Sequence, residues 1–475
     1  MIQNALPIIL TIICLAGCTT LVPKYTRPEA PIPAEWPKGP AYKDSAVTPG
    51  VPAAAEITWQ DFFTDERLKK VIDMSLNSNR DLRVAGLNID KARALYRIQR
   101  AELFPVVDAV GIGSKQRLPA DISGTGHSMT VEQYSVNLGV SSWELDFFGR
   151  IRSLKDRALE QYLATEQARR SAQISMVAEV GNVYMTLAAD RESLKLAQLT
   201  LETQEATYNL IRRRYEVGLT SELDLRQAQT RMEAARVDVA RYTRQVALDE
   251  NALNLLVGSP VPTELLPGEM GTVTTLKDIT AGLPSEVLIR RPDILQAENQ
   301  LKAANANIGA ARAAFFPRIN LTTIIGTISD ELSGLFKSGS GTWTFASQIV
   351  LPIFDTRSWW ALKVIKAGRE IAVAQYEKAI QAAFREVADA LAQRGTVGDQ
   401  IAAQESLVQA SAETYRLSNA RYTKGIDSYL SVLDAQRSLY AAQQGLIAIR
   451  LARLTNLVTL YKVLGGGDRD RGALW

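Results

Sequence analysis

Few side chains in this 475-residue sequence are suited to nucleophilic or metal chemistry. The only cysteines are Cys14 and Cys18, and the only histidine, His127, lies in a Gly/Ser/Thr-rich stretch. A lone loop histidine is typical of a solvated surface residue. With one histidine and two cysteines near the amino terminus, the sequence lacks the side chains to complete a Cys/His or Ser/His/Asp catalytic set. We therefore predict no enzyme, no cofactor and no metal site.

Charge and hydropathy exclude two further classes of protein. The sequence carries 54 Lys and Arg against 51 Asp and Glu, a formal net charge of +3, which gives no reason to propose nucleic acid as a partner. The basic run 212–214 does not change this, because on a helix its side chains spread around the axis. No window reaches the ~18 consecutive apolar residues of a membrane-spanning helix, so any membrane crossing would require strands.

The amino terminus has the features of an export signal. Residues 5–17 form a short apolar segment that ends in small residues before Cys18, which is typical of a signal peptide. The sequence Leu-Ala-Gly-Cys at 15–18 resembles the bacterial lipoprotein box. This resemblance implies a signal peptide over 1–17, acylation of Cys18 and, with Thr19 next, an outer-membrane destination. The alternative is an ordinary cleaved signal with an incidental cysteine. The Pro-rich stretch within 18–64 reads as an extended tether.

One turn sequence occurs twice. Residues 214–229 and 421–436 align without a gap at a constant offset of 207 residues, with Arg, Tyr, Gly, Ser, Leu, Ala and Gln repeated at matching positions. Each copy lies between two long patterns of helical periodicity. A repeated turn between repeated long helices indicates a duplicated architecture.

The duplication extends over two halves, 65–270 and 271–475, each predicted as helix, strand hairpin, long helix, turn and helix. The Phe-Pro steps at 104–105 and 316–317 end the first helix of each half, because a residue before proline avoids the helical region. The second long helix is expected to be interrupted near Gly395 and Gly398. The predicted strands are about 106–114, 134–143, 319–328 and 342–351, the long helices 152–215 and 359–422, the following helices 222–257 and 429–464.

The hairpins and helices both require partners. In the second strand Tyr134, Val136, Leu138 and Val140 face one way and small polar residues face the other. That alternation fits a lipid-facing barrel strand and equally a half-buried strand of a soluble sheet. Four strands cannot close a barrel, since bacterial barrels start at about eight strands. If the strands cross a membrane, several chains must therefore combine them.

Seven segments of the chain resemble the TolC family of outer-membrane efflux channels, within the lipoprotein branch typified by OprM. This resemblance implies a mainly α fold with a transmembrane β portion. It also implies a homotrimer in which four strands per chain form a 12-stranded barrel in outer-membrane lipid, above a periplasmic helical tunnel. It implies a periplasmic adaptor and an inner-membrane RND transporter as partners. The segments are 15–18, 79–82, 143–150, 283–285, 290–294, 310–317 and 429–437.

The same resemblance assigns roles to the repeated turns. The turns, about 216–221 and 423–428, would meet the adaptor. The family's aperture motif maps onto Leu430, Asp434 and Arg437, which share one helix face. Asp224 or Arg226 from the first copy would contribute to the closed state. The alternative is that these charges form ordinary surface pairs. The docking residues are Gly218, Leu219, Thr220, Gly425, Ile426, Asp427 and Ser428.

The function implied is a passive exit duct of a tripartite pump that exports drugs and other small toxic compounds. A channel for type I-like protein secretion is the alternative within the family. A periplasmic adaptor lipoprotein would have one helical hairpin inserted in β-domains, whereas this sequence predicts two hairpins of helices and two of strands. An envelope enzyme lacks any visible acid/base set.

Overall fold

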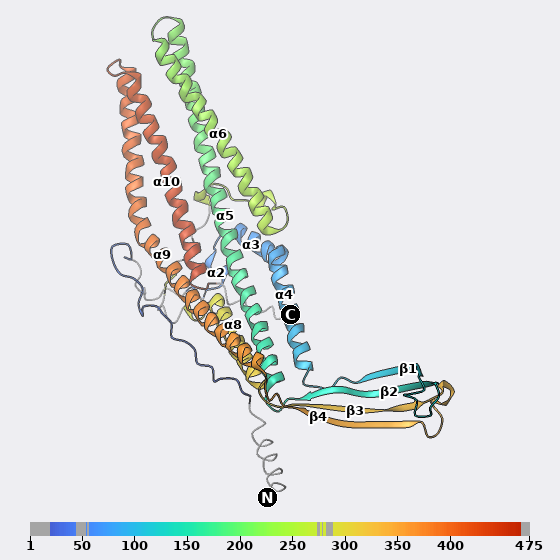
Figure 1. Ribbon diagram of the computed structural model, residues 1–475. Helices are drawn as coiled ribbons and strands as arrows, with labels where there is room; N and C mark the ends of the chain where they lie inside the picture. The colour runs from blue at the N-terminus through green and yellow to red at the C-terminus, as the bar shows by residue number, and fades with distance from the viewer. Residues whose placement is uncertain are drawn as a thin grey trace. The chain divides into compact units, whose positions relative to one another are not determined.

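The computed structural model describes residues 20–43, 54, 57–272, 276–277, 279–281 and 288–466. The predicted signal peptide, Cys18 and the motif at 283–285 lie outside these ranges. None of the helices in the described ranges is both long enough and apolar enough to cross a bilayer. In chain order (Figure 1) the elements are α2 (Trp59–Phe62), α3 (Glu66–Ser78), α4 (Arg80–Ala101), β1 (Asp108–Leu118), β2 (Met129–Leu145), α5 (Arg150–Glu216), α6 (Glu222–Val257), η2 (Thr263–Leu265), η3 (Met270–Thr272), α8 (Pro292–Ala313), β3 (Arg318–Ser329), η4 (Leu332–Gly334), β4 (Gly341–Val350), α9 (Thr356–Thr423) and α10 (Tyr429–Val463).

The chain divides into two compact units. The first contains Met1–Pro28, Asn88–Thr165 and Gln296–Tyr376, and the second contains Glu29–Leu87, Glu166–Leu295 and Glu377–Trp475. Each unit takes a matching segment from each half of the sequence. The strands belong to the first unit, and both repeated turns belong to the second.

The four strands form one antiparallel sheet in the order β1-β2-β3-β4. The two hairpins, β1-β2 and β3-β4, come from different halves of the sequence and are joined through β2 and β3. The register shifts between Val140 and Trp143, where β2 pairs with β3. Such a bulge bends a strand and increases its twist.

One face of this sheet carries a row of exposed apolar side chains. Leu138 lies opposite Ile325, which lies opposite Trp343, so the three side chains share a face. They are 52%, 64% and 76% exposed. The opposite face has Asn137 and Gly326 at neighbouring positions. This chain therefore leaves the apolar face uncovered, which argues against the half-buried strand of a soluble sheet.

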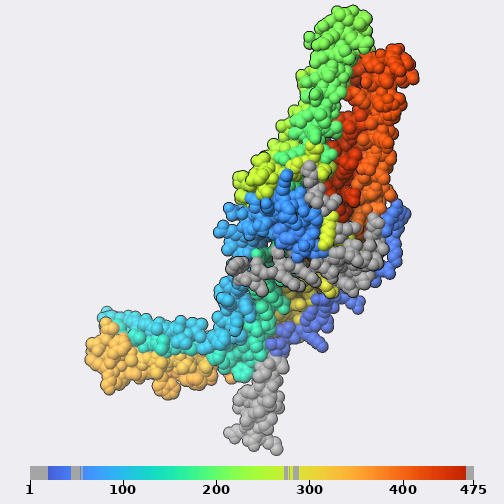
Figure 2. Space-filling view, turned by 180° about the vertical axis from the view of Figure 1, so that it is seen from behind, coloured from blue at the N-terminus to red at the C-terminus, as the bar shows by residue number. Residues whose placement is uncertain are grey.

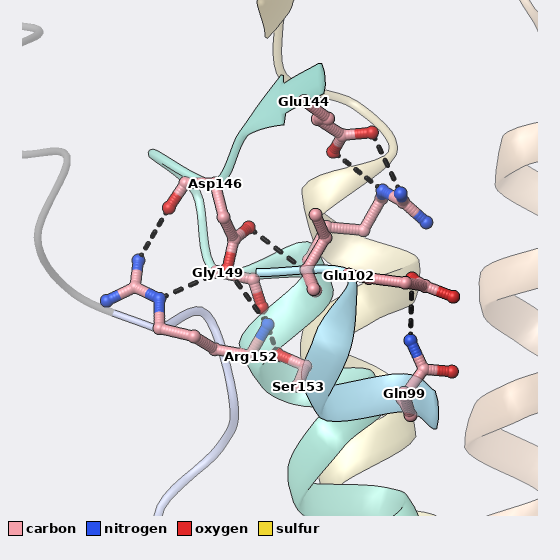
Figure 3. A network of polar contacts seen from close by, with 9 residues as sticks. Gln99, Glu102, Glu144, Asp146, Gly149, Arg152 and Ser153 are labelled. Carbon is pink, nitrogen blue, oxygen red and sulfur yellow. Dashed lines mark hydrogen bonds and ion pairs between the residues drawn. The ribbon is translucent and has the colours of Figure 1, made fainter. Parts of the chain in front are cut away.

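The step from β2 into α5 is fixed by a polar network (Figure 3). The guanidinium of Arg150 donates to both oxygens of Glu144 at 2.8 Å. The carboxylate of Asp146 accepts from the backbone N–H groups of Ile151 and Arg152 at 3.1 and 2.9 Å. Those N–H groups belong to the first helical turn and have no partner within the helix, so Asp146 acts as the cap.

The sequence pattern predicted one continuous helix before β1, but the structure has two, α3 and α4, which meet at Asn79. The side chain of Asn79 accepts from the N–H groups of Asp81 and Leu82 and donates to the carbonyl of Leu256. Asn79 has extended backbone angles, φ −65° and ψ 134°. An asparagine in this conformation starts a new helix, and helical periodicity alone does not reveal it.

The second unit has an aromatic core beside its long helices. The ring of Phe62 stacks on Tyr461 with centroids 4.1 Å apart, and the Tyr461 hydroxyl donates to the carbonyl of Ile57 at 2.9 Å. A Cβ on Gly181 of α5 would lie 3.0 Å from the ring of Phe63. The single glycine of this long helix therefore makes room for an aromatic side chain.

The predicted interruption of the second long helix near Gly395 and Gly398 is wrong, because α9 is continuous through both glycines. A Cβ on Gly395 would lie 2.4 Å from the carbonyl oxygen of Ala41. Next to this crossing, Lys43 pairs with Asp399 at 2.6 Å. Gly395 therefore allows the Pro-rich segment to pass close to the helix and does not break it.

Candidate functional site

The two repeated turns have the same backbone. Gly218 ends the turn after α5 with φ +74°, and Gly425 ends the turn after α9 with φ +72°. The N–H groups of Leu219 and Ile426 donate back to the carbonyls of Arg214 and Arg421 at 2.8 and 2.9 Å. This hydrogen-bond pattern is the Schellman motif, which satisfies the last carbonyls of a helix.

Apolar side chains project from both turns. Val217 and Leu219 are 68% and 70% exposed, and Ile426 is 58% exposed. Figure 2 shows both turns at the surface, the first in green and the second in orange-red. Exposed apolar side chains at two helix ends are typical of a protein contact surface.

The first turn is fixed by a capping box at the start of α6. The hydroxyl of Ser221 accepts from the N–H of Asp224, and the Asp224 carboxylate accepts from the N–H of Ser221. The hydroxyl of Thr220 donates to the same carboxylate at 2.8 Å. Burial raises the pKa of Asp224, but the hydrogen bonds from Ser221 and Thr220 outweigh burial and leave the pKa below its usual value.

The second turn uses different contacts. Ser428, which aligns with Ser221, makes no side-chain cap hydrogen bond to α10. Asp427 instead pairs with Arg421 of α9 at 2.5 Å. The hydrogen bond from Arg421 lowers the pKa of Asp427. This exposed ion pair connects the end of α9 to the start of α10 across the turn.

Beneath the turns, a buried cluster joins all four helices. Tyr208 of α5 and Tyr415 and Tyr422 of α9 pack against it, and Arg214 donates to the Tyr422 hydroxyl at 3.3 Å. Burial raises the pKa of Tyr429. The core residues of the cluster are Ile211, Leu225, Ala228, Tyr429, Val432 and Leu433.

The predicted aperture residues lie on α10 close to this cluster. Leu430 is 54% exposed, and Asp434 pairs with Arg437 at 3.4 Å with both side chains more than half exposed. From the first copy, Arg226 pairs with Glu222 at 3.3 Å. In the single chain, the structure therefore brings Asp434 and Arg437 together and does not pair Asp224 with Arg226.

Sequence reasoning missed two groups at this site. The first is the Arg421 partner of Asp427, and the second is the buried cluster around Tyr429. Both left a signal, because Arg214/Arg421 and Tyr215/Tyr422 are identical in the two copies of the turn. No group of three or more His, Cys, Asp or Glu in the described part of the chain is positioned to hold a metal ion.

Comparison with known proteins decides the family. The profile described as "Outer membrane efflux protein" matches residues 71–259 and 283–466, one segment in each half of the sequence. The chain belongs to the outer membrane efflux protein family. The outer membrane efflux proteins are channels and transport proteins, not a family of enzymes.

Named relatives cover almost the whole chain. It is 53% identical over 468 residues to the "Probable efflux pump outer membrane protein TtgC" of Pseudomonas putida, covering 98% of this chain and 96% of the relative. It is 43% identical to the "Outer membrane protein OprJ" of Pseudomonas aeruginosa, covering 98% and 95%. Among solved structures, the open state of the Neisseria gonorrhoeae MtrE outer membrane channel superposes with a TM-score of 0.85 at 39% identity, covering 94% of this chain and 98% of that one. The fold is therefore that of the TolC-family channels.

Proposed function

We propose that this outer membrane efflux protein is the passive exit duct of a tripartite RND-type pump for drugs and other small toxic compounds. The observation that carries the proposal is the sheet of the first unit. Its apolar row at Leu138, Ile325 and Trp343 is exposed, and β1 and β4 each pair on one side only among the described residues. Such a sheet is incomplete in one chain, because open edges cannot lie in lipid.

Three copies of the chain complete the sheet. Twelve strands lie within the range of bacterial outer-membrane barrels. In this homotrimer the apolar row faces outer-membrane lipid, and the long helices of three chains pack along one another in the periplasm. Long helices with little buried surface of their own gain stability from such neighbours.

The two turns serve as the pump-side end of the duct. Val217, Leu219 and Ile426 supply the exposed apolar contacts for a periplasmic adaptor protein, which connects the duct to an inner-membrane transporter. Asp434 of three chains forms a ring of carboxylates near the axis. Like charges in such a ring repel each other, and the pairing with Arg437 at 3.4 Å reduces that repulsion and favours the closed state.

Cys18 carries the lipid anchor of the duct. Its place after the Leu-Ala-Gly run at 15–17 supports acylation, and the acyl chains would hold the amino terminus in the outer membrane.

Export from cells tests the duct. Deleting the chain is expected to raise the intracellular accumulation of a fluorescent efflux substrate, and restoring it should reverse the rise. Gly425→Trp should fail to restore export while trimers remain, because it places a large side chain on the contact surface. Unchanged accumulation after deletion contradicts the proposal, and loss of trimers in Gly425→Trp would give the glycine a purely structural role. Crosslinking in the native envelope then identifies the adaptor and the transporter.

A further inference from the structure

An N-terminal strap, residues 20–28, is fastened along α8 in the first unit. Arg27 pairs with Glu298 at 2.6 Å, and the side chain of Glu298 is only 4% exposed. The Tyr25 hydroxyl donates to Glu298 at 3.2 Å. Asn305 donates to the carbonyl of Pro23 at 2.8 Å. A buried carboxylate paired in this way fixes the strap in one position.

Two glycines bring the start of the strap close to the helices. A Cβ on Gly309 of α8 would lie 2.4 Å from Cγ2 of Val22, and a Cβ on Gly149 would lie 2.9 Å from Cα of Thr20. Gly149 also has φ +71°, a conformation that other residues rarely adopt. Any side chain at either glycine would displace the strap, so its path up to Thr20 is built into the fold.

An apolar pocket of about 360 Å³ opens where the strap begins. Its one charged lining residue, Arg312, donates to the carbonyl of Leu21 at 3.1 Å. Phe315 packs edge-on against Trp359, with ring centroids 5.3 Å apart. The pocket is lined by Leu21, Arg312, Phe315, Phe316, Trp359 and Leu362.

The walls of this pocket are exposed to solvent in the single chain. Trp359 is 65% exposed and Phe316 is 38% exposed. Large aromatic surfaces left in water cost free energy, and a hydrocarbon ligand would remove them from water. The pocket suits a ligand that is apolar along its length, since five of its six lining side chains are hydrophobic.

We propose that this pocket binds a long acyl chain carried by Cys18 of the same protein, an inference that rests on the lipidation of Cys18 proposed above. Cys18 precedes Leu21, which lines the pocket, by three residues. Three residues of extended chain span at most about 11 Å, so the lipidated sulfur stays within reach of the pocket mouth. The strap therefore delivers the acyl chain to one site on the protein surface. This placement gives the anchor a position relative to the strands as well as an attachment to the bilayer.

The absence of other cysteines gives a direct test. Acylation blocks the sulfur of Cys18, and Cys14 leaves with the signal peptide, so a cysteine introduced by Leu362→Cys is the only free thiol of the mature protein. Its labelling by an apolar maleimide is compared in native envelopes between the acylated protein and an unacylated form, Cys18→Ala behind an ordinary cleavable signal peptide. We expect labelling to be about tenfold slower in the acylated protein, since an occupied pocket must open first.

Two further cysteine variants serve as controls for the labelling experiment. Ser338→Cys, at an exposed position between β3 and β4, should be labelled equally fast in both forms. Trp359→Cys provides a second reporter in the pocket if Leu362→Cys does not fold. Mass spectrometry of the N-terminal peptide measures the lipid on Cys18.

Two labelling results overturn the proposal. One is equally fast labelling of the pocket cysteine in both forms although the lipid is present on Cys18. The other is slow labelling in both forms, which assigns the pocket to bilayer lipid or another copy of the chain. A peptide without lipid also overturns it, and export by the same cells shows separately whether the duct itself functions.

Discussion

The turns at Gly218 and Gly425 have the same glycine, the same Schellman hydrogen bonds and the same buried cluster beneath them, yet different contacts hold them. In the first turn, Asp224 is held by Ser221 and Thr220 within a capping box. In the second, Ser428 leaves α10 without a side-chain cap, and an exposed ion pair crosses the turn. A capping box uses short local hydrogen bonds, whereas an exposed ion pair is weakened by salt and by competition from water.

Two charged residues near the second turn have no charged counterpart near the first. At the offset of 207 residues, Asp434 and Arg437 align with the neutral residues Gln227 and Thr230. The second copy therefore carries both the charges of the proposed aperture and the less firmly capped helix. We infer that the α5–α6 hairpin provides a fixed frame and that the α9–α10 hairpin is the part that moves when the duct opens. Small local changes can shift such an equilibrium if the two states differ little in free energy.

The largest expected effect comes from removing the two charges of the proposed aperture. Asp434→Ala combined with Arg437→Ala should raise single-channel conductance severalfold in planar bilayers, because the closed state loses the charged side chains that α10 contributes to the aperture. The matched control is Gln227→Ala with Thr230→Ala in the first copy, which should leave conductance unchanged. Equal conductance in both double variants would remove any gating role from the second turn.

The next effect concerns the buried cluster. Leu433 is 3% exposed, whereas its counterpart in the first copy, Arg226, has a side chain 64% exposed. Leu433→Ala should lower the local stability of the turns by about 2–4 kcal/mol, the usual cost of such a core truncation. Arg226→Ala should change it by less than about 0.5 kcal/mol, as most surface substitutions do. Hydrogen exchange of residues 217–233 and 424–440 measures the two effects, and similar values would show that the cluster does not hold the turn.

Helix capping distinguishes the two turns more finely. Ser221→Ala removes a capping hydrogen bond and should cost about 1 kcal/mol at the start of α6. Ser428→Ala, at the matching position, should cost a few tenths of that amount, since Ser428 has no cap hydrogen bond to lose. Amide exchange at the first turn of each helix reports both. A larger loss in Ser428→Ala than in Ser221→Ala would reverse the assignment of fixed and moving hairpins.

The sequence predicted the architecture of these regions better than their contacts. Periodicity and the 207-residue offset place both turns and the long helices, since apolar spacing and glycine are local signals. The break at Asn79 and the continuity of α9 through Gly395 were missed, because each depends on a segment far away in the sequence. The Arg421–Asp427 pair was missed for a related reason: six residues across a turn have no fixed relative position until the turn is known.

Salt gives the smallest and most selective effect. Raising the salt concentration from 0.1 to 1 M shortens the screening length from about 10 to 3 Å and weakens exposed ion pairs. Exchange at 424–430 should rise about twofold as the Arg421–Asp427 pair weakens, while exchange at 217–223 should change less, because the exposed Arg226–Glu222 pair lies within α6 and does not cross the turn. Acid acts on both turns in the same direction. The pKa values of Asp427 and Asp224 both lie below the ordinary aspartate value. Each stabilising effect is therefore present above about pH 4 and is lost as the pH falls through the lowered pKa of its own aspartate. Asp427→Asn should abolish the salt response of the second turn. A salt response that persists in this variant, or that appears equally at the first turn, would mean that the ion pair does not hold the α9–α10 turn.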